Sequence, residues 1–70
     1  MREITKEYAK EHNLKRLARA EDSDMSKLIL LMERLKEKEQ IKYYSMDLII
    51  FNTLNQTSNI EISFWADDEN

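Results

Sequence analysis

Glycine, proline and cysteine are all absent from this 70-residue sequence. The lack of glycine excludes the glycine-rich loops that hold phosphate groups, and any turn with a positive φ must use asparagine or aspartate instead. The lack of cysteine excludes disulfides and cysteine-based metal sites as sources of stability. A chain of this length buries only about 60% of its unfolded surface, so oligomerisation or a partner is expected to add stability.

Histidine and long apolar runs are scarce as well. His12 is the only histidine, and the sequence assembles neither a metal site of the usual kind nor a catalytic triad around it. The carboxylates stand beside lysines on segments expected to be exposed, so no desolvated acid–base pair is predicted. No run approaches the ~20 apolar residues of a membrane span, and no signal-peptide pattern opens the chain. We expect a protein of the bacterial cytoplasm or of an infected host cell that is not an enzyme and uses no cofactor or metal.

Basic residues are confined to the first part of the chain. All eleven lysines and arginines lie within residues 1–42, whereas residues 43–70 carry only acidic charges. A polyanion would therefore meet the first part more readily, and a basic protein surface would meet the second. Ordinary solvated faces would show the same charges, so this pattern alone identifies no partner.

The densest apolar run, residues 28–32, lies near the centre of the sequence. Ser23 and Asp24 are good N-cap residues, and a helix is predicted from about Met25 to Glu39. Leu30 and Leu31 lie outside its main apolar face, so this central helix needs cover from more than one direction. The main face is formed by Met25, Leu28, Ile29, Met32 and Leu35.

Residues 2–22 are rich in helix formers and predict a first helical segment, with Thr5 as a candidate N-cap. Its apolar positions do not form one continuous stripe. A break near His12 and Asn13 would resolve this conflict, because asparagine tolerates the left-handed conformation that tight turns need. One bent helix and two short helices are both compatible with the pattern.

The residues after Gln40 are rich in β-branched and aromatic types. Residues 59–65 alternate strictly between polar and apolar, and residues 55–58 are polar and turn-like, so residues 48–65 predict a β-hairpin. An alternative makes Ser45–Asn55 a third helix. The predicted fold class is α+β, with two helices, or three if the first is broken near Asn13, followed by a C-terminal β-hairpin packed on the central helix. Residues 1–66 are expected to form a single domain, and residues 67–70 an acidic mobile tail.

The leading functional hypothesis is a small protein-binding module that inhibits or modulates another protein. In its size and in an amino-acid composition that favours AT-rich codons, the chain is similar to inhibitors of host or defence proteins encoded by phages or mobile elements, although no motif carries this likeness. Aromatic residues dominate binding energy at interfaces, and acidic residues could form a rim around them. Phe64 is assigned to the core rather than to this contact. The predicted protein-binding residues are Tyr43, Tyr44, Trp65, Asp67, Asp68 and Glu69.

The alternative is a small dimeric nucleic-acid-binding transcriptional regulator. On a continuous first helix, one side would carry basic residues that could follow phosphates and a tyrosine that could stack on bases. Residues 4–14 also resemble the first helix and turn of a helix-turn-helix, but Arg19 and Asp22 are charged where its second helix is apolar, so no family is assigned. The residues of this alternative site are Tyr8, His12, Lys15, Arg16 and Arg19.

The central helix also predicts a homodimer. Its apolar residues follow a three-four-three spacing that could pair with a second copy, although the heptad pattern lapses at Glu39 and Lys42, so no long coiled coil is expected. The seam would consist of Met25, Leu28, Met32 and Leu35.

Overall fold

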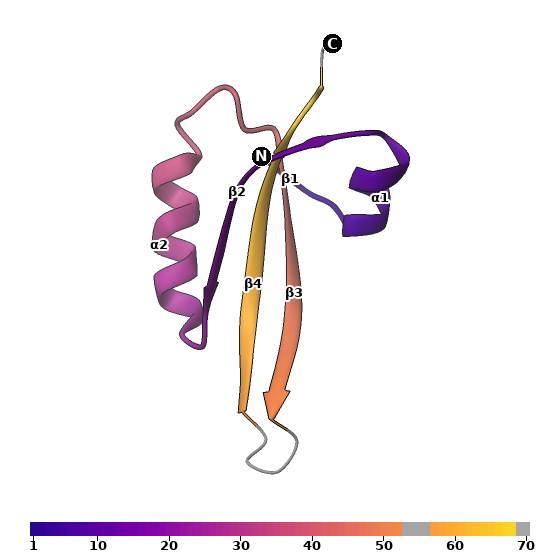
Figure 1. Ribbon diagram of the computed structural model, residues 1–70. Coiled ribbons are helices and arrows are strands. Elements are labelled where there is room, and N and C mark those ends of the chain that lie inside the picture. Colours follow the sequence, from indigo (N-terminus) through magenta and orange to yellow (C-terminus); the bar gives the residue numbers. More distant parts are fainter. Residues whose placement is uncertain (53–56, 69–70) are drawn as a thin grey trace.

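Two helices and four strands make up an α+β fold (Figure 1). The structure is a computed structural model that describes residues 1–52 and 57–68. The elements in chain order are β1 (Arg2–Glu3), α1 (Lys6–Glu11), β2 (Lys15–Asp22), α2 (Met25–Leu35), β3 (Tyr43–Asn52) and β4 (Thr57–Ala66).

The four strands form one mixed sheet in the order β1-β3-β4-β2. β4 lies between β2 and β3 and is antiparallel to both, whereas the short β1 is parallel to β3. β2 pairs with β4 only as far as Asp22 opposite Ile60, but β3 and β4 remain paired to Asn52 opposite Thr57. The end of the β3–β4 pair therefore extends beyond the rest of the sheet, as Figure 1 shows at its lower end.

α2 covers one face of the sheet and forms the core with it. Its Leu28 is 2% exposed and packs with Ile62 and Phe64 of β4, both fully buried. Ala18 and Ala20 of β2 pack against the same core. Because alanine has so small a side chain, α2 can approach β2 closely at these positions.

α1 lies on the side of the sheet away from α2 (Figure 1). Thr5 caps its first turn, where the Thr5 hydroxyl accepts a hydrogen bond of 3.0 Å from the backbone N–H of Tyr8. Its C-terminus is a Schellman motif, in which Leu14 N–H donates to Ala9 C=O (2.9 Å) and Asn13 N–H donates to Lys10 C=O (3.2 Å). Asn13 has φ = 53°, the left-handed conformation that glycine usually supplies. The predicted break near Asn13 is confirmed.

The prediction that helix continues after this break is wrong. Residues 15–22 form strand β2 rather than the second half of a helical segment. Their local preference is helical, since they include lysine, arginine, leucine and alanine. Pairing with β4 along seven positions overrides that preference, because strand formation depends on long-range partners that a local pattern does not contain.

The predicted arrangement of two or three helices followed by a C-terminal hairpin on the central helix is also wrong. β3 and β4 are instead the two middle strands of a sheet that includes β1 and β2 from the first part of the chain. The alternative helix at Ser45–Asn55 is wrong as well, because β3 is a strand through Asn52. Residues 53–55 of that segment lie outside the described residues.

α2 begins at Met25 as predicted, with Asp24 as its N-cap: the Asp24 carboxylate accepts a hydrogen bond of 3.0 Å from Ser26 N–H. The hydrogen bond from the Ser26 hydroxyl is the main cause of a lowered pKa for Asp24, and the bond from Ser26 N–H adds to it. The helix ends at Leu35, four residues before the predicted end at Glu39. Neither helix in the described part of the chain is long and apolar enough to cross a membrane.

Candidate protein-binding surfaces

Strand alternation divides the predicted aromatic contact between the two faces of the sheet. Tyr43 lies opposite Trp65 in the β3–β4 register, and the next pair is Tyr44 opposite Phe64. Because neighbouring residues of a strand point to opposite faces, Tyr43 and Trp65 lie on the face away from α2, whereas Tyr44 lies on the core side. Tyr44 is half-buried and packs against the core.

Tyr43 and Trp65 are half-buried, and their polar atoms have partners within the chain. Trp65 Nε1–H donates to Ser45 Oγ at 3.0 Å, and the guanidinium of Arg16 lies 5.9 Å from the Trp65 ring centroid. The Tyr43 hydroxyl donates to Asp67 at 3.1 Å, and this hydrogen bond raises the pKa of Tyr43. Contacts within the chain therefore position Tyr43 and Trp65 and pair their polar atoms.

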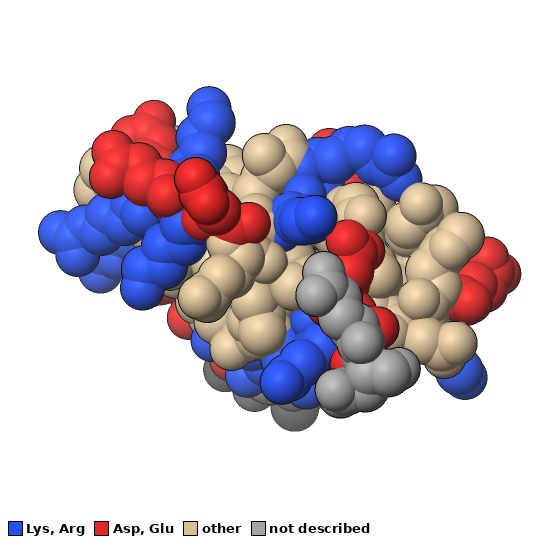
Figure 2. All heavy atoms as spheres, turned by 90° about the horizontal axis from the view of Figure 1, so that it is seen from above, with Lys and Arg blue, Asp and Glu red and all other residues tan. Residues whose placement is uncertain are grey.

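Asp67, the first acidic residue after β4, is held by contacts within the chain. Asp67 also forms an ion pair with Lys42, with Nζ and Oδ2 3.5 Å apart. Asp68 is exposed, and Glu69 lies outside the described residues. Figure 2 views this end of the molecule and shows basic and acidic side chains mixed across it rather than one acidic rim.

Glu61 is the centre of the charged network on the same face as Tyr43 and Trp65. It is 4% exposed, and it forms ion pairs with Lys6 of α1 and Arg19 of β2, the latter at 2.5 Å. The hydrogen bond from Lys6 is the main cause of a lowered pKa for Glu61, and Arg19 adds to it, while burial opposes the shift. Lys6 also lies 3.7 Å from Asp47 of β3. This network connects α1 to three strands.

The residues of the alternative nucleic-acid site are separated by the fold. Tyr8 and His12 stay together at α1, with ring centroids 4.1 Å apart. The three basic residues of the site lie on β2 instead, so they cannot form a helical stripe with this pair. Arg19 forms ion pairs with Glu61 and Glu21, and the hydrogen bond to Glu61 is the main cause of a raised pKa for Arg19. The guanidinium of Arg16 lies over the Trp65 ring. Lys15 lines a cleft at the end of β2.

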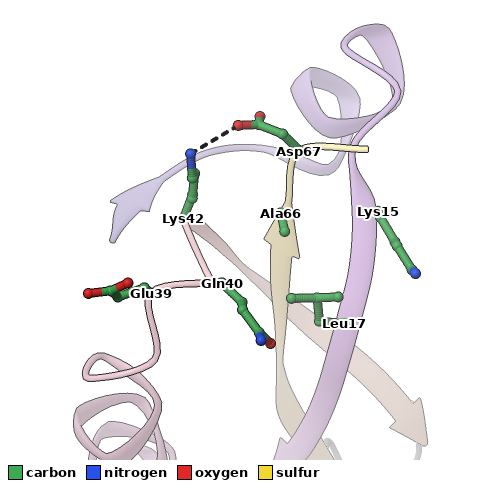
Figure 3. A pocket seen from close by; sticks show the side chains of 7 residues that line it. All are labelled: Lys15, Leu17, Glu39, Gln40, Lys42, Ala66 and Asp67. Atoms are coloured by element: carbon green, nitrogen blue, oxygen red, sulfur yellow. Dashed lines mark ion pairs between the residues drawn. The ribbon is translucent and has the colours of Figure 1, made fainter. Parts of the chain in front are cut away.

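That cleft has a volume of about 400 Å³ and lies between β2, the end of β4 and the segment that joins α2 to β3 (Figure 3). Figure 3 shows Leu17 and Gln40 extending into the space below Ala66, whereas Lys15 and Glu39 point away from it. The cleft is shallow, and its lining mixes charged, polar and apolar residues. Its lining residues are Lys15, Leu17, Glu39, Gln40, Lys42, Ala66 and Asp67.

A second groove lies between α2 and β3, and most of its lining residues are apolar or aromatic. It has a volume of about 210 Å³. We call Met1, Ile29, Met32 and Tyr44, which line it, its floor, and the charged lining residues Glu33 and Lys36 its rim. Tyr44 is the one aromatic residue of the predicted contact that lies here.

Exposed apolar residues continue from this groove along the same side of the molecule. Ile29 is 41% exposed and Met25, one helical turn earlier, is 39% exposed. Leu48 of β3 is 66% exposed and points to the same face as Tyr44, because it lies four residues further along the strand. We call Met25, Ile29, Met32, Tyr44 and Leu48 the apolar surface.

Only part of this surface could be predicted from the sequence. Five consecutive apolar residues in α2 indicated that one helix face could not bury them all, but not which would stay exposed. The exposure of Leu48 depends on its place in the sheet, further along β3 than Tyr44 and Met46, which pack against the core. No local pattern contains this information. Of the predicted dimer seam, Leu28 is in the core, and Met32 and Leu35 pack against it, so Met25 is its one exposed member.

No protein-family model, curated protein or solved structure matches the chain. Within residues 1–52 and 57–68, no three side chains of histidine, aspartate or glutamate come together as a metal site.

Proposed function

We propose that the protein is a small cytoplasmic binding module that inhibits or modulates another protein through the apolar surface on α2 and β3. The observation that carries this proposal is the exposure of Met25, Ile29 and Leu48 next to the groove at Tyr44. Exposed apolar groups that adjoin a groove mark interaction sites more often than scattered single residues do.

The chemistry of the surface favours a partner segment with apolar side chains and charged flanks. The floor of the groove offers methionine, isoleucine and tyrosine, and methionine adapts its shape to varied partners. Glu33 and Lys36 at the rim can pair with charges of either sign. A short amphipathic helix or strand of the partner fits this combination.

Tyr43, Trp65 and Asp67 form the second proposed contact, on the opposite face. We rank it below the apolar surface because its tryptophan N–H, its tyrosine O–H and its carboxylate are already paired within the chain. A partner would have to break or share these hydrogen bonds and this ion pair. Replacing bonds within the chain by bonds to a partner contributes less to the free energy of binding than burying exposed apolar groups does.

Affinity capture from the natural host tests this proposal. The wild-type chain is expected to retain a specific protein, identified by mass spectrometry, that a chain with Leu48→Lys loses. Trp65→Ala tests the second contact in the same experiment and is expected to retain the protein. Loss with Trp65→Ala and retention with Leu48→Lys would assign the function to the other face.

Nucleic-acid binding stays the alternative prediction. It would depend on Lys15 and Arg16 of β2, since Arg19 is engaged by Glu61. Binding of this kind falls steeply as salt rises, because phosphate contacts release counterions. A gel-shift assay at low salt with duplex DNA and single-stranded RNA is expected to show no retention if the function is protein binding; salt-sensitive retention would favour the alternative.

A further inference from the structure

β2 has one edge that no strand of the described residues covers. The sheet ends with this strand, which pairs with β4 on its inner side along most of its eight residues. Alternate backbone N–H and C=O groups of an edge strand point outward and can pair with another strand. The opposite edge of the sheet is formed by the two-residue β1 beside Tyr43 and Tyr44 and by β3 itself beyond them.

The charges along β2 change sign from one end to the other. The first part carries Lys15, Arg16 and Arg19, and the last part carries Glu21 and Asp22. When two copies of such a strand pair antiparallel, the basic part of each lies beside the acidic part of the other. Opposite charges across a strand pair stabilise it, and like charges destabilise it. The strand is therefore complementary to a second copy of itself.

Strand geometry restricts the register of this pairing. With a twofold axis perpendicular to the sheet, each face of one sheet continues into the same face of the other. A β2 residue must therefore lie opposite a β2 residue of the second copy whose side chain is on the same face. With Ala20 on the axis, Arg19 lies opposite Glu21 of the second copy, and Ala18 lies opposite Asp22. Arg19 and Glu21 share the face that carries Glu61, as their partners in β4 show. The Leu17 bulge lies outside this central segment.

We propose that two copies of the chain pair antiparallel through their β2 edges and so join their four-stranded sheets into one. This dimer uses a different surface from the proposed protein-binding contact and differs from the predicted seam on α2, so it can be tested independently of both. It also fits a chain too short to bury much apolar surface alone.

Two variants of opposite charge test this pairing. Arg19→Glu places a glutamate opposite Glu21 of the second copy, and Glu21→Lys places a lysine opposite Arg19 of the second copy. The wild type is expected to sediment as a dimer whose dissociation on dilution can be measured. The dissociation constant of the dimer that each variant forms alone is expected to be at least about tenfold higher than that of the wild type. An equimolar mixture of the two is expected to form a dimer with one copy of each, resolved by native mass spectrometry.

Control variants carry the same charge changes away from β2. Lys38→Glu and Glu11→Lys alter exposed residues and are expected to dimerise like the wild type. Circular dichroism confirms that each variant is folded. A wild-type mass that stays monomeric up to millimolar concentration overturns the proposal, and so does a mixture in which no mixed dimer forms.

A measurement on the unaltered chain covers the case in which a variant does not fold. Amide hydrogen exchange is followed at several protein concentrations. The amides of β2 are expected to exchange more slowly as concentration rises, while those of α1 do not change. Concentration-independent exchange in β2 would contradict the dimer.

Discussion

Ser45 of β3 and Ser63 of β4 lie opposite each other and are both buried, but only one has a partner for its hydroxyl. Ser45 Oγ accepts the Trp65 Nε1–H at 3.0 Å. Ser63 Oγ has no hydrogen-bond partner among the described residues. A buried polar atom without a partner costs free energy, whereas a satisfied one contributes a modest net gain.

This contrast predicts opposite effects for two alanine substitutions in the same cross-strand pair. Ser45→Ala removes the acceptor of a half-buried tryptophan and is expected to lower the free energy of unfolding by about 1–2 kcal/mol. Ser63→Ala removes an unpaired hydroxyl and is expected to leave that free energy unchanged or to raise it by up to about 1 kcal/mol. Urea denaturation of the two variants measures both. Equal losses would show that Ser63 has a partner of its own.

Glu61 makes the stability of the fold depend on pH. Its pKa is lowered from the ordinary value of 4.5, chiefly by the hydrogen bond from Lys6. A carboxyl group whose pKa is lower in the folded chain than in the unfolded chain makes its full contribution to stability at pH values above its ordinary pKa. The contribution is lost as the pH falls from there through the lowered pKa.

Glu61→Gln is therefore expected to be destabilising at neutral pH but not in acid. The expected loss at neutral pH is about 1–2 kcal/mol, because Lys6 and Arg19 are exposed enough to be hydrated when their partner becomes neutral. The difference from the wild type should shrink as the pH falls below the ordinary carboxyl pKa. Denaturant titrations across this range measure it, with the exposed Glu37→Gln as the control. A difference that persists in acid would mean that Glu61 acts by packing and not by charge.

At the scale of elements, the parts of the fold that follow from adjacent residues could be predicted from the sequence. Asp24 at the start of α2, Thr5 at the start of α1 and Asn13 in the turn after it are all local signals. β2 could not be predicted, because its residues favour a helix and only pairing with β4, some forty positions away in the register, makes them a strand. The division of Tyr43 and Tyr44 between two faces follows from that same sheet.

The close contact between β2 and α2 depends on small side chains. Ala18 and Ala20 face α2, which follows β2 after only two residues and so has little freedom to move away. Ala18→Leu is expected to lower the free energy of unfolding by about 1–3 kcal/mol, because the larger side chain overpacks this contact. Ser58→Leu, at an exposed position of β4, is the control and is expected to change stability by less than about 0.5 kcal/mol. Thermal denaturation compares them. If Ala18→Leu were equally harmless, the contact of α2 with β2 would be looser than the structure shows.

The whole molecule has one helix on each face of its sheet, but these helices cover the sheet unequally. On the side of α1, charged and aromatic residues pair with one another around Glu61 and Trp65. On the side of α2, apolar residues of β3 extend beyond the cover that this helix provides, and Leu48 is the most exposed of them. This difference is why we place the protein-binding contact on the side of α2. The exposure of that side depends on the sheet order, so it could not be predicted from the sequence.

Two neighbouring residues of α2 allow the most direct test of this placement. Ile29 lines the groove beside Tyr44, whereas Leu30 is 62% exposed and does not line it. Consecutive residues of a helix point about 100° apart, so the same substitution can be made on and off the proposed contact. The measurement is the affinity of the purified partner for Ile29→Lys and for Leu30→Lys, determined by calorimetry. We predict that Ile29→Lys weakens binding at least about tenfold and that Leu30→Lys binds like the wild type. Equal affinities for both variants, or a loss confined to Leu30→Lys, would contradict the assignment of the binding contact to this surface.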